Sequence, residues 1–239
     1  MLSKKLSKIK NYLLDLVFPV QCLGCGQGDL YLCARCLESI LLIDYFVCPV
    51  CRRPSANGQT CLNCQSKTRL DGLIYALNYE QPLVRQAIHA IKYSFIQDLM
   101  PTVAELLIKV LDQSRFHQDF RADVVVPIPL HRQKLAQRGF NQAKLLAEIL
   151  AQKYSWKIDN KILQRTKSTR SQTGLPRLRR LTNVKDIFSV KAPESIKNKN
   201  IILVDDVCTT GATLEEAAKI LKQHGAAKVW AITLARGEN

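Results

Sequence analysis

IILVDDVCTTGAT, residues 201–213, is the segment from which the architecture of this chain is best inferred. Its first four residues are large and apolar, which is typical of a strand buried on both faces of a parallel sheet. Two acidic residues, Asp205 and Asp206, follow, and a turn rich in hydroxyl groups leads into an expected helix. The segment therefore predicts a strand, a ligand-binding turn and a helix of an α/β protein.

The turn has the composition of a phosphate-binding loop. Thr209, Thr210 and Thr213 offer hydroxyl donors, and Gly211 allows the backbone to approach a ligand closely. The amino end of the following helix directs its free N–H groups to the same place. Because carboxylates repel phosphate, the acidic pair is expected to face sugar hydroxyls, a divalent ion or both. A phosphorylated ribose meets both conditions, although Asp and Thr also begin many ordinary helices.

The string VDDVCTTGAT resembles the phosphoribosyl diphosphate signature of type I phosphoribosyltransferases, and nearly the whole chain resembles the ComF/ComFC family of competence proteins. The resemblance implies a Rossmann-like α/β domain in which Asp205 and Asp206 are the catalytic pair and bind the ribose hydroxyls. It also implies that Mg²⁺ joins the diphosphate to those hydroxyls. The residues implied to hold the 5-phosphate of the sugar are Thr209, Thr210, Gly211, Ala212 and Thr213.

Eight of the nine cysteines occur in four Cys-X-X-Cys pairs. Two such pairs supply the four thiolates of a closed tetrahedral zinc site, so the sequence predicts two structural zinc sites. Disulfides would need an oxidising compartment, and the amino-terminal residues do not read as a secretion signal. Interleaved pairing is compatible with the spacing, but sequential pairing gives two zinc ribbons, with ligands Cys22, Cys25, Cys33 and Cys36, and Cys48, Cys51, Cys61 and Cys64.

The composition is that of a globular protein with polyanionic partners. The 239 residues are 47% apolar, enough for one ordinary domain and a small module. The formal net charge of +15 favours nucleic acid, diphosphates or an anionic membrane surface as partners. Since no apolar run approaches the roughly 18 residues of a spanning helix, we expect a soluble, cytoplasmic protein.

Three regions are expected along the chain. Residues 1–18 form a basic amphipathic helix, which packs on the rest of the protein or makes peripheral contact with an anionic membrane. Residues 19–68 form the double zinc ribbon. Residues 69–239 form the phosphoribosyltransferase-like domain, with strands at 73–79, 122–130 and 228–235 and helices at 82–93, 100–111, 142–154 and 214–224.

Basic residues gather in two stretches of the larger domain. Residues 131–142, HRQKLAQRGFNQ, read as a loop at the carboxyl end of a parallel strand, where α/β proteins bind ligands. Lys92 is expected near the ribose. Residues 161–185 carry no acid and, by resemblance, include a flexible loop that closes over the diphosphate. The candidate diphosphate ligands are Arg132, Lys134 and Arg138 in the first stretch, and Arg170, Gln172 and Arg180 in the second.

Two functions fit these features. The first is a ComF-type protein that binds phosphoribosyl diphosphate with Mg²⁺ and handles incoming single-stranded DNA during natural transformation, together with other DNA-uptake proteins. The alternative is an active phosphoribosyltransferase of nucleotide metabolism with an unknown acceptor and no role with DNA. The few residues after the last expected strand leave little room for a base-reading segment, and no acceptor is evident from the sequence.

Overall fold

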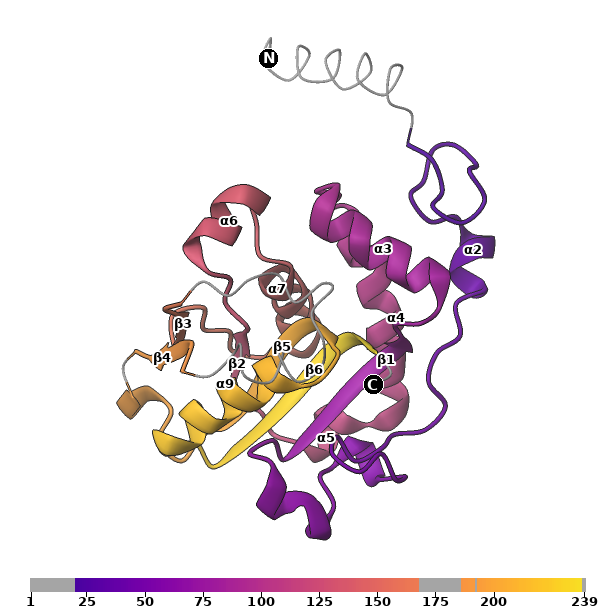
Figure 1. Ribbon diagram of the computed structural model, residues 1–239. Helices are drawn as coiled ribbons and strands as arrows, with labels where there is room; N and C mark the ends of the chain where they lie inside the picture. The colour runs from indigo at the N-terminus through magenta and orange to yellow at the C-terminus, as the bar shows by residue number, and fades with distance from the viewer. Residues whose placement is uncertain (1–19, 168–185, 192, 238–239) are drawn as a thin grey trace. The chain divides into compact units, whose positions relative to one another are not determined.

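The computed structural model describes residues 20–167, 186–191 and 193–237 (Figure 1). The chain divides into two compact units, residues 1–41 and residues 42–239. The expected helix at 1–18 and the candidate ligands Arg170, Gln172 and Arg180 lie outside the described residues. The domain limits at residues 18 and 68 remain predictions.

A parallel sheet forms the centre of the second unit. In the described part of the chain it has four strands in the order β1-β6-β5-β2, and each neighbouring pair is parallel. The apolar run at the start of β5 is fully buried, as expected for a strand covered on both faces. The α/β fold class predicted from the sequence is confirmed. The strands are β1 (Gly72–Asn78), β2 (Val124–Pro127), β5 (Asn200–Cys208) and β6 (Lys228–Arg236).

Helices cover both faces of this sheet (Figure 1). Helices α4 (Leu99–Ser114) and α7 (Gln142–Tyr154) pack on one face, and α3 (Pro82–Tyr93) packs against α4. Helix α9 (Ala212–Gln223) crosses the other face, next to a small antiparallel pair. The pair consists of β3 (Leu163–Arg165) and β4 (Phe188–Val190).

The prediction of a loop after β2 is wrong, because Arg132–Arg138 forms the helix α6. Its residues are good helix formers without β-branching. The Nδ1 atom of His131 accepts a hydrogen bond from the N–H of Gln133 at 3.3 Å and caps the helix. Gly139, in the left-handed conformation with φ of 74°, ends it. The carboxyl end of β2 therefore presents its basic residues on a short helix.

The segment that carries the second set of cysteines packs on the sheet. The N–H of Ile43 donates to the carbonyl of Ala76 at 2.9 Å, and the N–H of Thr60 donates to that of Asp71 at 2.8 Å. Ala76 belongs to β1, so this segment and the sheet share one compact unit. Shorter elements are α2 (Ala34–Glu38), η1 (Ala56–Gly58), η2 (Leu62–Lys67), α5 (Phe116–Asp119) and η3 (Pro193–Ser195).

Each helix in the described ranges is too short or too polar to span a membrane.

Candidate functional site

The two adjacent carboxylates lie inside β5, which ends at Cys208, four residues beyond the end expected from the apolar run. The strand continues because its hydrogen bonding to β6 extends to the pair Cys208 and Arg236. Asp206 is buried, and its Oδ2 atom lies 2.9 Å from the Nζ atom of Lys92 in the last turn of α3. Burial lowers the pKa of Lys92, but the Asp206 carboxylate outweighs burial and the net pKa is raised. Lys92 is therefore charged and fixes Asp206.

Asp205 has a different environment from its neighbour. Its Oδ1 atom accepts a hydrogen bond from the N–H of Asp206 at 2.9 Å. Burial and the nearby Asp206 carboxylate raise the pKa of Asp205 to about 7, against the opposing charges of Lys92 and Arg165. Asp205 therefore exchanges a proton near neutral pH, and no described residue forms an ion pair with it as close as the one between Lys92 and Asp206.

Cations from three elements gather around this pair. Burial lowers the pKa of Lys134 on α6, and the charges of Arg165, Arg138 and Lys92 lower it further. The charge of Asp205 in turn acts on Arg165 at the end of β3. Lys134, with Arg138 near it, is thus close to Lys92 and Arg165, the two cations that act on Asp205, whereas Arg132 is exposed at the start of α6. With four cations and two carboxylates, the site suits a ligand with several negative charges.

The predicted phosphate loop, residues 209–213, joins β5 to α9. Gly211 caps the helix with a φ of 76°, which favours glycine. The hydroxyl of Thr210 accepts a hydrogen bond from the N–H of Ala212 at 3.3 Å. Asp205 and residues 207–214 line a small hollow of about 20 Å³. The structure thus brings the residues predicted for ribose and for 5-phosphate together.

The sequence RGFNQ, residues 138–142, connects α6 to α7 and orients Arg138. Asn141 caps α7, since its Oδ1 atom accepts from the N–H of Ala143 at 3.1 Å and its Nδ2 atom donates to the carbonyl of Ile128 at 3.0 Å. Phe140 is buried beneath the turn. The Nη1 atom of Arg138 donates to Oε1 of the buried Gln142 at 2.9 Å.

Arg165 is the site residue that sequence reasoning missed. It was one of eight basic residues in the acid-free run 161–185, and nothing in that run distinguishes it. Its position follows from β3, which pairs with β4 and places residue 165 beside Asp205. Lys92, which was expected near the ribose, contacts Asp206, one of the residues predicted to bind the ribose.

Replacing Lys92 with Met should destabilise the fold by about 2 kcal/mol at pH 8, because the partly buried carboxylates lose their counter-charge. The folded-state pKa of Asp205, already raised to about 7, then loses the lowering effect of Lys92 and lies further above its unfolded value, so the folded state takes up a proton as the pH falls. The loss of stability caused by Lys92→Met should therefore reach its full size above pH 7 and be smaller at pH 5. Urea unfolding at both pH values measures it, and Arg85→Met on the exposed side of α3 is the control. An equal loss at both pH values would contradict the assignment.

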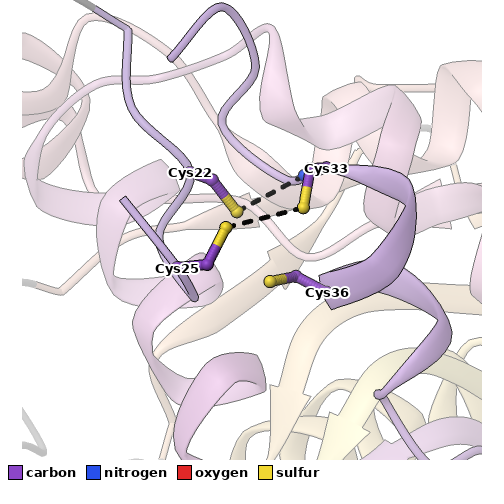
Figure 2. Close-up of side chains that lie close together, drawn as sticks. All are labelled: Cys22, Cys25, Cys33 and Cys36. Carbon is purple, nitrogen blue, oxygen red and sulfur yellow. Dashed lines mark hydrogen bonds between the residues drawn. The ribbon is translucent and has the colours of Figure 1, made fainter. Parts of the chain in front are cut away.

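Eight of the nine cysteines form two separate sets of four, and Figure 2 shows the first of these sets. Within each set the ligand atoms lie within 4.8 Å of one another. The Sγ atoms of Cys25 and Cys33 are 3.7 Å apart, as are those of Cys51 and Cys61. Zinc–sulfur bonds of about 2.3 Å in a tetrahedron place two sulfurs about 3.8 Å apart, so both sets fit zinc. Sequential grouping is confirmed, with Cys22, Cys25, Cys33 and Cys36 in one set and Cys48, Cys51, Cys61 and Cys64 in the other.

One thiol in each set is prepared to bind metal as a thiolate. Burial raises the pKa of Cys22, but backbone N–H groups, first that of Cys33, outweigh burial and bring it to about 6. Cys48 has the same balance, with N–H groups of Cys51 and Cys61, and also a pKa of about 6. Metal ligands must be deprotonated, and in each set this thiol loses its proton most readily, whereas the neighbouring thiols and burial raise the pKa of Cys36 and of Cys64 to about 12.

Comparisons with known proteins agree with this geometry. Family models of the phosphoribosyl transferase domain and the double zinc ribbon domain match residues 96–239 and 13–65. "Competence protein F" of Haemophilus influenzae is 32% identical over 92% of this chain and 98% of its own length. "DNA utilization protein YhgH" of Escherichia coli K12 is 30% identical over 91% of this chain and 98% of its own length. "Competence protein ComFC" of Bacillus subtilis is 31% identical over 88% of this chain and 86% of its own length.

Proposed function

Because the chain belongs to the ComF/ComFC family, which joins a phosphoribosyltransferase domain to an amino-terminal double zinc ribbon, we propose that it binds phosphoribosyl diphosphate with Mg²⁺. We further propose that it works in the cytoplasm on incoming single-stranded DNA during natural transformation. The observation that carries the first part is the acidic pair Asp205 and Asp206, which lies beside the predicted phosphate loop and next to Lys92 and Arg165, with Lys134 close to both cations.

Each part of the ligand has a matching group in the site. The carboxylates of Asp205 and Asp206 accept hydrogen bonds from the ribose hydroxyls. The phosphate loop, residues 209–213, holds the 5-phosphate through hydroxyls and the N–H groups at the start of α9. Lys134 and Arg138 face the diphosphate. Arg132, Arg170, Gln172 and Arg180 remain proposed diphosphate ligands.

The same arrangement is suited to transfer of the phosphoribosyl group. When bound with the ligand, Mg²⁺ supplies neutralising charge to the diphosphate, and the oxygen-rich donors of the site and ligand fit this hard cation. Lys134 and Arg138 stabilise the negative charge on the leaving pyrophosphate. Asp205 and Asp206 hold the ribose in place and face the positive charge that grows on its ring.

Exposed aromatic rings next to these cations support the proposed role with DNA. Tyr93 and Phe95, at and just after the end of α3, are 44% and 52% exposed. The guanidinium carbon of Arg138 lies 5.4 Å from the ring centroid of Tyr93. Aromatic rings beside positive charge bind single-stranded nucleic acid by stacking on its bases. Phe140 is buried and unavailable for stacking. The names of the relatives point to the same process, and other DNA-uptake proteins are proposed partners.

Calorimetric titration of phosphoribosyl diphosphate with Mg²⁺ tests the sugar site. The variant Asp205→Asn/Asp206→Asn should bind at least about 100-fold more weakly than wild type, because two charged acceptors are lost. The charge-matched control is Glu80→Gln/Asp98→Asn, which changes two exposed residues and should bind as wild type. Equal binding by the two variants would show that the ligand binds elsewhere.

Fluorescence anisotropy with a labelled oligothymidylate tests the role with DNA. Binding should weaken steeply as salt rises, since phosphate contacts release counterions. The Asp205→Asn/Asp206→Asn variant should keep this binding, because the carboxylates face sugar hydroxyls rather than DNA phosphates. A protein that binds the sugar diphosphate but no oligonucleotide would support the alternative, a phosphoribosyltransferase without a role with DNA.

A further inference from the structure

A second hollow lies within the second unit, between the second cysteine segment and the turn from β5 to α9. Its volume is about 400 Å³. Arg52 and Lys67 from the cysteine segment and Arg236 from β6 line it, together with Thr210, Gly211 and Ala212 of the phosphate loop. We name it the ribbon pocket. Its lining therefore brings three cations to a loop already assigned to phosphate.

Arg236 is a buried cation that uses only part of its hydrogen-bonding capacity within the described residues. Only 5% of the residue is exposed, and its Nη2 atom donates to the carbonyl of Pro49 at 2.7 Å. Its Nε and Nη1 atoms have no hydrogen-bond partner among the residues that the structure describes. A buried guanidinium with unused donors is costly unless an anion binds it.

The groups around Arg236 do not neutralise it. Burial lowers the pKa of Arg236, and the charge of Arg52 lowers it further. The carboxylate of Glu215 also lines the ribbon pocket, but it accepts hydrogen bonds from the hydroxyl of Thr68 and, at 2.8 Å, from the N–H of Arg69. Burial raises the pKa of Cys208 to about 11, so this thiol is neutral. The ring of Tyr75 lies 5.6 Å from the guanidinium carbon of Arg236.

We propose that the ribbon pocket is a second phosphate-binding site, in which Arg236, Arg52 and Lys67 hold one phosphate group. A planar guanidinium with free N–H groups is well matched to phosphate oxygens. The phosphate belongs either to the backbone of a polynucleotide or to a small phosphate compound. The proposal goes beyond the function proposed above, because the ribbon pocket does not include the carboxylates of Asp205 and Asp206.

The phosphate loop separates the two sites and contributes to both. Thr210, Gly211 and Ala212 line the ribbon pocket and also the small hollow beside Asp205. A phosphate held in the ribbon pocket therefore contacts the back of the loop that is proposed to bind the sugar 5-phosphate.

The test compares two variants with the same net charge. Arg52→Gln/Lys67→Gln removes the two exposed cations that line the ribbon pocket. Arg53→Gln/Arg69→Gln removes two exposed cations that are neighbours in sequence but do not line it. Each protein, with Asp205 and Asp206 intact, is titrated with inorganic pyrophosphate without Mg²⁺ by calorimetry and with a labelled oligothymidylate by anisotropy.

For at least one of the two probes, the affinity of the pocket variant should be at least about 10-fold below that of the control variant. Loss with the oligonucleotide alone identifies a backbone phosphate, and loss with pyrophosphate alone identifies a small phosphate compound. Loss with both means that the site accepts either. Equal affinities of the two variants for both probes would mean that only net charge matters, and the proposal would be overturned.

Arg236→Met provides a separate readout on the buried cation. Added pyrophosphate should raise the thermal midpoint of the Asp205→Asn/Asp206→Asn protein, because a ligand that binds only the folded state stabilises it. The same protein with Arg236→Met added should lose at least half of this shift, whatever its midpoint without ligand. An unchanged shift would show that Arg236 does not bind phosphate and would overturn its assignment.

Discussion

Replacing Cys48 with Ser should lower the free energy of unfolding of the main transition by about 4 kcal/mol, because structural zinc contributes directly to folding. Cys48 is fully buried, and its cluster belongs to the same compact unit as the sheet. Thr60, within the same segment, donates its hydroxyl hydrogen to the carbonyl of Leu70 at 2.6 Å, just before β1. Loss of the metal therefore also removes contacts of the sheet. For a unit of this size the expected fall in the thermal midpoint is about 8–16 °C.

The equivalent change in the first cluster is the matched control. Cys22 is also buried, but its set lies in the compact unit of residues 1–41. Cys22→Ser should remove one equivalent of zinc, as Cys48→Ser does, and leave the main unfolding transition within about 2 °C of wild type. Elemental analysis and calorimetry measure both quantities. Equal effects of the two substitutions on the main transition would contradict the division into two units.

Gly58→Ala should cost about 4 kcal/mol of stability through a backbone clash. Gly58 has a φ of 77°, and a Cβ atom there would lie 2.1 Å from the carbonyl oxygen of Leu73 in β1. Alanine in this conformation costs about 1 kcal/mol, and the overlap with a backbone atom, which can only be relieved by moving the segment off β1, adds about 3 kcal/mol.

Gly139→Ala separates the two contributions. Gly139 has a nearly identical φ of 74°, but apart from its two chain neighbours no described residue would have an atom within 4 Å of a Cβ atom there. Its substitution should therefore cost only about 1 kcal/mol in urea unfolding. If Gly58→Ala were no more harmful than Gly139→Ala, the close packing of the cysteine segment on β1 would be incorrect.

The parts of the fold that follow from local sequence were predicted well. The apolar run at residues 201–204 gave the buried strand, and the expected helices at 82–93 and 142–154 match α3 and α7. The cysteine spacing indicated two sites, because ligands two residues apart can only bind the same ion. Helix α6 was missed because the prolines before it and its short length both favour a loop.

Properties that depend on long-range packing could not be predicted. Lys92 and Asp206 are distant in sequence, and their ion pair joins the last turn of α3 to β5, which is separated from β1 by β6 in the sheet. Arg165 meets Asp205 only through the pairing of β3 with β4. Arg236 reads in the sequence as an ordinary cation after an apolar strand, and its burial depends on the cysteine segment that packs beside it.

The order of strands in the sheet has a consequence for biosynthesis. Strand β1 is at an edge of the sheet, and its strand partner is β6, which ends at Arg236. A growing chain can bind zinc at both sets of cysteines early, but β1 has no place in the sheet until residue 236 has left the ribosome. The second cluster, although synthesised early, therefore waits for β6 before it packs on its final surface, and until then its contacts with β1 are unmade.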